Sequence, residues 1–309
     1  MPASGTLVAA AAEDRRMRFF AIGLMLVVMV CFTAMDTSSK WLGARLPTPE
    51  IVWARFVAAQ AVSLAAMRVW SRPHIIRPRR PGLQILRSVF LLGSTSSVVF
   101  SLHWLQLAES STLGFLNPIF VALLAAPVLG EKVGRAQIAA IAVGFLGVLI
   151  ATRPGTNAFQ PIVLLAIAGV MSNSGYVVST RLLARYDASE TTLIWTPTVG
   201  VVLITPILPF IWRWPESPRI WLVMAGLGTF GALGHGLLIV AHKFAPAPVL
   251  APFFYTQLIW MTVSGLVVFG DWPHPATLVG AALVAASGGY LILRERTLRA
   301  PVVTPAGAA

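Results

Sequence analysis

Residues 19–35 read FFAIGLMLVVMVCFTAM, an apolar run that contains no charged side chain. A helix needs about 17–25 predominantly apolar residues to cross the hydrocarbon core of a bilayer. The run is too long for the core of a signal peptide, and no small-residue cleavage site ends it. It therefore predicts a first membrane-spanning helix, which follows a tail at residues 1–18 that ends in three arginines, Arg15, Arg16 and Arg18.

The composition of the whole chain is also that of a membrane protein. Hydrophobic residues make up 57% of its 309 residues and charged residues only 11%, whereas soluble domains are about a quarter charged. The bilayer must therefore solvate most of the side chains. The net charge is +12, but the basic residues lie between apolar runs. They indicate topology signals rather than a nucleic-acid surface.

The hydropathy pattern predicts ten membrane-spanning helices joined by short polar connections, and so an all-α integral membrane protein. The predicted spans are Phe19–Met35, Ile51–Met67, Leu83–Leu105, Ser110–Leu129, Ala136–Ala151, Pro161–Val178, Thr192–Trp212, Trp221–Val240, Val249–Phe269 and Ala276–Leu293. If the N-terminus is cytoplasmic, sixteen Lys and Arg residues fall on the inner side and five on the outer side. This bias predicts that both termini, including the tail at residues 294–309, face the cytoplasm of a bacterium and that the protein lies in the inner membrane.

The two halves of the sequence resemble each other at a constant spacing. Residues 127–131 (PVLGE) align with residues 267–271 (VVFGD), and at the same offset Asn117 aligns with Gln257. The alignment predicts a duplication of five spans. Because five is odd, the second copy enters the membrane in the opposite orientation, an architecture typical of secondary transporters. We expect a central site lined by the first, second, fourth, sixth, seventh and ninth spans.

Two stretches carry a family resemblance. Residues 108–118 (AESSTLGFLNP), followed by residues 128–131 (VLGE), resemble the EamA-type domain of the drug/metabolite transporter superfamily, and a second copy follows from Ala247 to Leu293. The second copy departs from the pattern at Asp271 and Ser287. The resemblance implies ten helices in two inverted five-helix repeats, at residues 19–151 and 161–293, around a central cavity. It also implies transport without ATP or a cofactor, and the sequence has no phosphate-binding Gly-x-x-x-x-Gly-Lys-[Ser/Thr] loop.

A narrower resemblance concerns the substrate. Residues 35–42 (MDTSSKWL) and 49–56 (PEIVWARF) are similar to bacterial riboflavin importers of this superfamily, and amino-acid and S-adenosylmethionine carriers share parts of them. Riboflavin uptake is thus the narrowest prediction, with an amino-acid or S-adenosylmethionine transporter as the alternative. An intramembrane lipid-modifying enzyme is an alternative of another class, for which Asp271 and His274 are the nearest acid/base pair.

Charged groups inside spans are costly in lipid and therefore face protein or a cavity. Arg55 lies a turn into the second span, where it either contacts an anionic or carbonyl group of the substrate or pairs with Asp36 or Glu50. Asp36 and Lys40 either form an i,i+4 ion pair or act as gating or proton-sensitive groups. His235, between two glycines, is another candidate for a proton-sensitive group.

Polar amides and aromatic rings complete the predicted substrate site. The amides are Asn117, before Pro118, its counterpart Gln257, and Asn173; each could bind the substrate or join two helices. Flat walls for a planar heterocycle could come from Trp53, Tyr176, Trp195 and Tyr255. No catalytic group, metal cluster or cofactor motif is predicted, and the single Cys31 forms no internal disulfide. The expected partners are a small-molecule substrate and the bilayer, with no nucleic acid.

Small residues recur in the fifth and tenth spans, among them Gly144, Gly147, Gly280 and Gly288. Such spacing allows close helix approach. These helices could form the interface of a homodimer, so that the protein is either a monomer or a homodimer.

Overall fold

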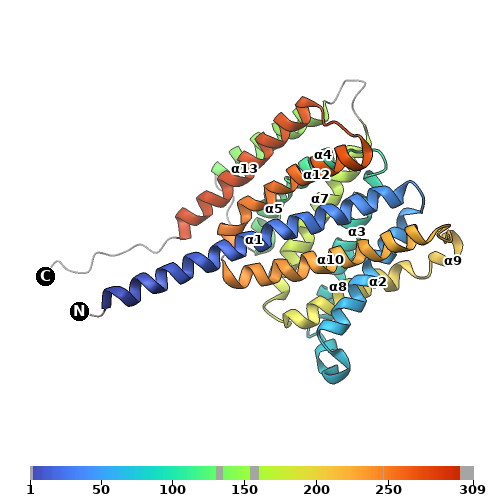
Figure 1. Cartoon of the computed structure of the whole chain (residues 1–309), viewed down its shortest axis with the longest axis horizontal. Coiled ribbons are helices and arrows are strands. Elements are labelled where there is room, and N and C mark those ends of the chain that lie inside the picture. The colour runs from blue at the N-terminus through green and yellow to red at the C-terminus, as the bar shows by residue number, and fades with distance from the viewer. Residues whose placement is uncertain (1–2, 130–134, 154–159, 246, 300–309) are drawn as a thin grey trace.

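The computed structural model describes residues 3–129, 135–153, 160–245 and 247–299, which form helices and no strand (Figure 1). The first half contains α1 (Ala3–Gly43), α2 (Thr48–Ala66), α3 (Pro81–Ser101), α4 (Leu107–Gly114), α5 (Asn117–Leu129) and α6 (Arg135–Thr152), with 3-10 turns at Val69–Ser71 and Pro73–Ile76. The second half contains α7 (Ile162–Leu183), α8 (Ser189–Ile204), α9 (Leu208–Ile211), α10 (Pro218–Phe244), α11 (Ala247–Leu250), the 3-10 helix η3 (Ala251–Thr256), α12 (Gln257–Ser264), the π-helical turn η4 (Gly265–Phe269) and α13 (Pro275–Arg299).

Each of the ten predicted segments is largely helical. Five helical stretches in the described ranges are long and apolar enough to cross a membrane: Met17–Gly43, Pro81–Ser101, Leu107–Ala125, Ile162–Leu183 and Pro218–Phe244. Four further apolar helices are shorter: Ile138–Thr152, Ser189–Ile204, Phe253–Phe269 and Pro275–Tyr290.

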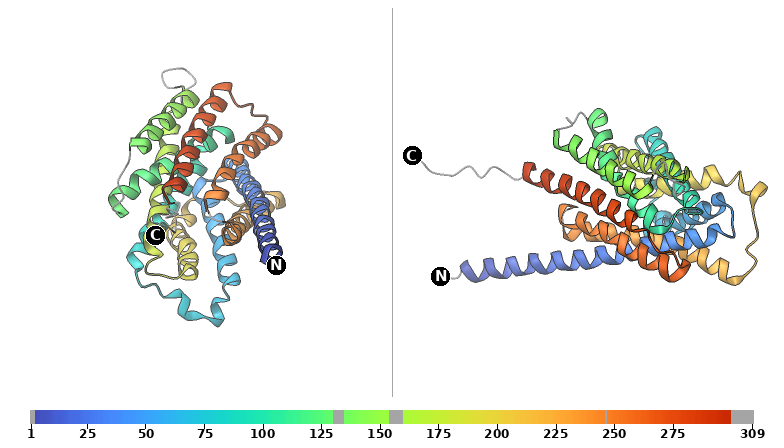
Figure 2. Two further views of the ribbon diagram at one scale, coloured as in Figure 1. Left: turned by 90° about the vertical axis from the view of Figure 1, so that its left-hand side faces the viewer. Right: turned by 90° about the horizontal axis from the view of Figure 1, so that it is seen from above.

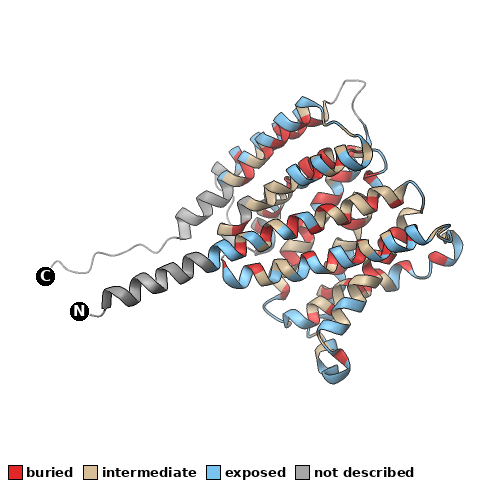
Figure 3. Cartoon of the chain, viewed as in Figure 1, coloured by how far each residue is buried: buried red, intermediate tan, exposed pale blue. Residues whose placement is uncertain are grey.

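The outer surface of the bundle carries large apolar side chains. Phe210 is 86% exposed and Val267 is 76% exposed, and exposed residues run along the outer faces of most helices (Figure 3). A water-soluble monomer rarely exposes apolar surface on this scale. The distribution fits a protein whose outer face contacts lipid.

Helix α1 is longer than the sequence predicted. Its 41 residues span about 60 Å at 1.5 Å per residue, twice the thickness of the hydrocarbon core. The Ala-rich N-terminal stretch continues the helix because alanine has the highest helix propensity and nothing in residues 3–18 interrupts it. The first turns of α1 therefore project from the bundle, in the same direction as the last turns of α13 (Figures 1 and 2).

The helix boundaries repeat at the spacing seen in the sequence. Helices α5 and α12 begin at Asn117 and Gln257, and α1 and α7 end at Gly43 and Leu183. Both pairs have the same offset as the sequence repeat. The fourth and ninth predicted spans are broken at equivalent positions, the first of them next to Pro118, whose ring cannot fit inside a continuous helix.

The packing of the helices has the same twofold pattern. Helix α1 packs against α10, as α7 packs against α3; α2 packs against α10, as α8 packs against α3; and α5 packs against α7, as α12 packs against α1. The pairs α2–α8 and α6–α13 join equivalent elements of the two halves. These helix contacts therefore correspond when the halves are exchanged, and the halves interlock (Figure 2).

Small residues of the fifth and tenth predicted spans pack against other parts of the same chain. A Cβ added at Gly147 would lie 2.7 Å from the carbonyl oxygen of Gly280, and one added at Gly280 would overlap Ala151. These glycines allow α6 and α13 to approach closely. Similarly, the hydroxyl of Tyr255 occupies the space beside Gly288.

Candidate functional site

Three of the predicted polar residues lie on helices that pack together. Asp36 lies on α1, Arg55 on α2 and His235 on α10, and the Arg55 guanidinium is within electrostatic range of both other groups. Asp36 and Arg55 are partly buried, and His235 is exposed. His235 belongs to the eighth predicted span, which was not among the spans expected to line the central site.

The charged atoms of this interior cluster are not paired with each other. Within the described residues, neither the Asp36 carboxylate nor the Arg55 guanidinium forms a hydrogen bond or an ion pair within 4.0 Å. The ring of His235 packs against Phe32, with 4.9 Å between ring centroids and 57° between planes. The cluster thus contains a separated acid and base, with an aromatic pair beside them.

Lys40, one turn beyond Asp36, pairs with a residue far away in the sequence. Its Nζ donates to Asp271 Oδ2 at 2.6 Å and to the Leu105 carbonyl at 3.1 Å, and it lies 4.9 Å from the ring centroid of Phe269. Of the two alternatives for Asp36 and Lys40, the i,i+4 ion pair is therefore not formed, because the tertiary fold brings the Asp271 carboxylate to the ammonium. Asp271 comes from the second half of the chain, so this pair joins the halves at one end of the bundle.

Arg87 on α3 forms a second buried cluster, which the sequence analysis did not assign. It is 3% exposed and donates to the hydroxyls of Thr180, Thr196 and Tyr176, the last at 2.9 Å. The guanidinium also lies 4.4 Å from the centroid of the Tyr176 ring. The Arg87 guanidinium therefore contacts both the hydroxyl group and the ring of Tyr176. The only sequence signal for this cluster was an arginine inside a predicted span.

A polar network closes the same end of α3, α7 and α8. The fully buried Gln84 donates to Asp187 Oδ2 at 2.9 Å and to Thr192 Oγ1 at 3.2 Å. The backbone N–H of Arg79 donates to Asp187 Oδ1 at 2.6 Å. Together with the Arg87 cluster, these bonds tie α3 of the first half to α7 and α8 of the second half.

The predicted amides have different surroundings. Asn117 Oδ1 accepts from Asn173 Nδ2 at 3.1 Å and from Ser174 Oγ at 2.8 Å, so these residues join α5 to α7. This is the interhelical alternative that the sequence left open. Gln257 lies at the start of α12 and is partly buried. Glu131 lies outside the described residues.

The predicted aromatic residues do not form one wall. The Trp53 indole donates to Thr205 Oγ1 at 3.0 Å, and the Trp195 indole donates to the Ile76 carbonyl at 2.8 Å. Thr205 lies ten residues beyond Trp195 along α8, or about 15 Å at 1.5 Å per residue. Tyr255 packs edge-on against Phe115, with ring centroids 4.9 Å apart. These rings therefore lie in separate parts of the bundle.

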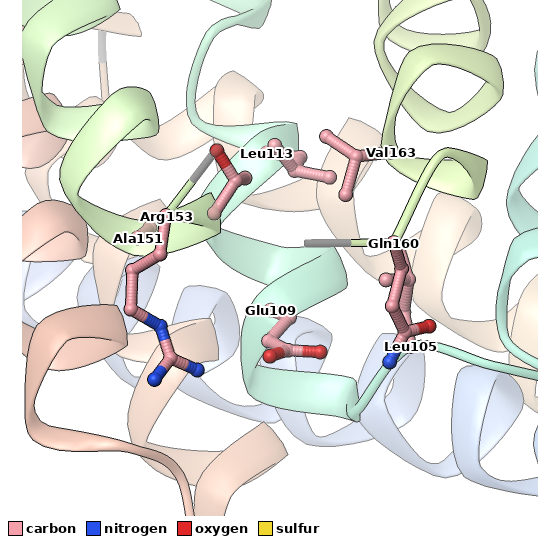
Figure 4. Close-up of a pocket in the computed structure, with 8 residues that line it drawn as sticks. Leu105, Glu109, Leu113, Ala151, Arg153, Gln160 and Val163 are labelled. Carbon is pink, nitrogen blue, oxygen red and sulfur yellow. The ribbon is translucent and has the colours of Figure 1, made fainter. Parts of the chain in front are cut away.

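A small pocket opens between α4, α6 and the start of α7 (Figure 4). Its polar lining comes from Glu109, Thr152, Arg153 and Gln160. Leu105, whose carbonyl accepts from Lys40, also lines it. The pocket contains none of the interior cluster residues, so it is separate from Asp36, Arg55 and His235.

Comparison with known proteins identifies the family. The profile of the EamA-like transporter family matches residues 19–153 and again residues 160–293. The chain belongs to this family. A solved structure described as "Crystal structure of protein" shares the fold with a TM-score of 0.61 at 20% sequence identity, and the match covers 94% of this chain and 99% of the other.

Named relatives of this EamA-like transporter include two kinds of carrier. An S-adenosylmethionine uptake transporter of Rickettsia conorii is 25% identical over 275 residues, which cover 89% of this chain and 93% of the relative. A riboflavin transporter of Brucella anthropi is 25% identical over 282 residues, covering 88% and 98% respectively. A riboflavin transporter of Vibrio cholerae is 23% identical, covering 86% and 91%.

Membership of this family decides between transporter and enzyme. The EamA-like family and the named relatives are transporters, so this chain is a multi-pass membrane transporter and not an enzyme. The prediction of an EamA-type drug/metabolite transporter is confirmed. The residues considered for the enzyme alternative have structural partners, since Asp271 pairs with Lys40 and His274 Nδ1 accepts from the N–H of Ala276.

Proposed function

We propose that this EamA-like transporter carries a small organic metabolite into a bacterial cell across the inner membrane by alternating access. The interior cluster of Asp36, Arg55 and His235 carries this proposal. It is polar and retains accessible surface, and its residues come from α1 and α2 of one half and α10 of the other. A site between two halves can be exposed to either side when the halves rock against each other.

The proposed topology is ten spans in two inverted five-span halves. It is supported by the repeated register of the helix boundaries and by the helix contacts that correspond between the two halves, such as α1–α10 and α7–α3. An even number of spans brings both termini to one side. The ends of α1 and α13 extend in the same direction from the bundle (Figure 1), and the excess of Lys and Arg predicts that this side is the cytoplasm.

In this scheme, two sets of contacts lie where gates are expected, one toward each side of the membrane. The Lys40–Asp271 pair, supported by a 2.7 Å hydrogen bond between Thr37 and Ser264, lies toward the predicted periplasmic side. The Gln84–Asp187 network and the Arg87 cluster lie toward the predicted cytoplasmic side. Opening to one side requires breaking one set while the other stays closed. Asp36 and His235, between the sets, remain candidates for proton-sensitive groups.

The substrate has two candidates. Similarity of residues 35–42 and 49–56 to riboflavin importers supports riboflavin, as do the relatives in Brucella and Vibrio. The Rickettsia relatives, described as uptake transporters, support S-adenosylmethionine at the same level of identity. Both candidates combine a planar heterocycle with a polar extension.

The test is uptake into proteoliposomes that contain the purified full-length protein. Radiolabelled riboflavin, S-adenosylmethionine and a panel of amino acids are offered separately, with and without a proton gradient. Saturable uptake of one of them above the level of protein-free liposomes is expected. Uptake of none, by protein that is correctly folded and inserted, would refute the proposed function. Stimulation by the gradient would identify proton coupling.

A further inference from the structure

The connection between α2 and α3 concentrates positive charge. Residues 68–80, called the basic connection below, contain no acidic residue and five arginines, Arg68, Arg72, Arg77, Arg79 and Arg80. All five side chains are exposed. A topology signal requires only that basic residues lie on the inner side. The concentration of five arginines in one short segment therefore needs a separate explanation.

Most of these guanidinium groups have no protein partner. In the described ranges, the side chains of Arg68, Arg72, Arg77 and Arg79 form no hydrogen bond and no ion pair within 4.0 Å. The Arg80 guanidinium lies 4.9 Å from the centroid of the Tyr186 ring. Like charges this close in sequence repel each other, and guanidinium groups bind phosphate oxygens through charge-assisted hydrogen bonds. The basic connection thus has the composition of an anion-binding segment.

The basic connection is held in place by the second half of the chain. The Ile76 carbonyl accepts from the Trp195 indole at 2.8 Å, and the backbone N–H of Arg79 donates to Asp187 Oδ1 at 2.6 Å. Two 3-10 turns shape the backbone before these bonds. A segment that is already ordered loses less conformational entropy when it binds a ligand.

The same segment exposes apolar side chains beside its charges. Trp70 is 72% exposed and Ile76 is 41% exposed. The basic connection, drawn in light blue, lies at the edge of the helix bundle (Figures 1 and 2). Tryptophan is enriched at the level of the lipid headgroups, and clustered basic residues beside a span attract anionic lipids. A free anion in solution would leave Trp70 and Ile76 exposed to water, whereas a lipid would cover them.

We infer that the basic connection binds the phosphate headgroups of anionic phospholipids in the leaflet on the predicted cytoplasmic side. The guanidinium groups contact the phosphates, and Trp70 lies at the boundary with the acyl chains. Because the segment is bonded to Asp187 and Trp195, a bound lipid stabilises the contact of α3 with α7 and α8. This site is additional to the proposed transport function and does not depend on the substrate.

The first experiment needs no variant. Thermal unfolding of the purified full-length protein in detergent is followed while phosphatidylglycerol or phosphatidylcholine with the same acyl chains is added. Each basic residue near an anionic surface contributes about fivefold in affinity, which is about 1 kcal/mol. Phosphatidylglycerol should therefore stabilise the protein at concentrations on the order of 100-fold lower. The preference should fall steeply between roughly 0.1 M and 0.5 M NaCl, because salt screens exposed charges.

The second experiment assigns the preference to the arginines. The combined variant Arg68→Gln, Arg72→Gln and Arg77→Gln removes three guanidinium groups that have no protein partner, and should reduce the preference to about tenfold or less. Lysine at the same three positions keeps the charge and should retain most of the preference.

A matched control removes the same amount of charge from separate places. The combined variant Arg135→Gln, Arg181→Gln and Lys243→Gln changes three exposed residues on α6, α7 and α10. All three lie on the same predicted side of the membrane as the basic connection. This variant should keep the preference of the wild type for phosphatidylglycerol.

A third comparison separates a lipid from a free anion. Inorganic phosphate, tested against NaCl at equal ionic strength, should not stabilise the protein, and Trp70→Ala should weaken the effect of phosphatidylglycerol severalfold. Stabilisation by inorganic phosphate equal to that by the lipid, or an unchanged lipid effect in folded Trp70→Ala protein, would overturn the lipid site.

The remaining outcomes also decide the matter. Equal stabilisation of the wild type by the two lipids, or a full preference in the folded glutamine variant, would overturn the site. If the glutamine variant does not fold, a preference of the wild type that salt leaves unchanged would overturn it instead. None of these measurements uses transport, so uptake of no substrate would refute the proposed function and leave this site intact.

Discussion

Breaking the Lys40–Asp271 pair should open the transporter toward the periplasm. The Lys40 Nζ lies 2.6 Å from Asp271 Oδ2, and the two side chains are 16% and 26% exposed. A hydrogen bond to a charged group contributes about 1.5–3 kcal/mol, and partial exposure reduces this to about 1–2 kcal/mol. Because the pair exists only when this end is closed, Asp271→Asn should increase the fraction open to the outside about 5- to 30-fold.

The opening can be followed by thiol labelling. Cys31 is the only cysteine of the chain and is buried, so Cys31→Ser provides a background free of thiols. Thr37→Cys then places a thiol beside the gate, where the wild-type Thr37 hydroxyl contacts Ser264. The labelling rate with a membrane-impermeant maleimide, added from outside, should rise by the same factor as the open fraction when Asp271→Asn is added.

The control is Arg45→Gln, which removes a charge at the same end of the protein. Arg45 contacts the Trp41 carbonyl and ring on its own helix and does not join the halves, so labelling should stay at the background rate. Exchange of the paired charges, Lys40→Asp with Asp271→Lys, should restore slow labelling. An Asp271→Asn protein that is folded but is labelled no faster than the background would refute the assignment of this pair as a gate.

Three further predictions concern helix packing and are measured as thermal unfolding of the purified protein in detergent. Gly280→Val should prevent close packing of α6 and α13, because its side chain would overlap Ala151, and should destabilise the protein by about 1–3 kcal/mol; an unchanged melting temperature would contradict the packing. Gln84→Met should cost about 1–3 kcal/mol because it removes a buried donor, and stability equal to wild type would show that the network contributes nothing. Asn117→Leu should cost about 1–2 kcal/mol through the loss of its bonds to α7; a loss of transport without a loss of stability would instead place Asn117 at the substrate.

Most of the fold could be predicted from local features of the sequence. In lipid, an apolar segment must satisfy its own backbone hydrogen bonds, and a helix does so. Each predicted segment is largely helical, as this argument requires. The constant spacing between the two halves predicted that Asn117 and Gln257 are equivalent, and each of them begins a helix. The length of α1 was underestimated, because the prediction followed hydropathy and the helix continues through a stretch that is not membrane-like.

The partners of individual side chains could not be predicted in the same way. Lys40 and Asp271 are 231 residues apart, and only the interlocking of the two halves brings them together. Arg87 donates hydrogen bonds to neutral hydroxyl groups rather than to an acidic side chain. Its positive charge therefore did not indicate which residues would be its partners. Asp36, Arg55 and His235 were predicted as site residues because placing an ionisable side chain inside a membrane span is energetically unfavourable. Every such residue is therefore a candidate for a functional role.

The two-orientation architecture can be tested most directly at one pair of equivalent loops. Arg45 follows α1 and Arg185 follows α7, so they occupy equivalent positions in the two halves. In the Cys31→Ser background, Arg45→Cys and Arg185→Cys are labelled separately with an impermeant maleimide in intact cells. The account predicts that Arg45→Cys reacts from outside and that Arg185→Cys reacts only after the inner membrane is permeabilised. Reaction of both from the same side would contradict it.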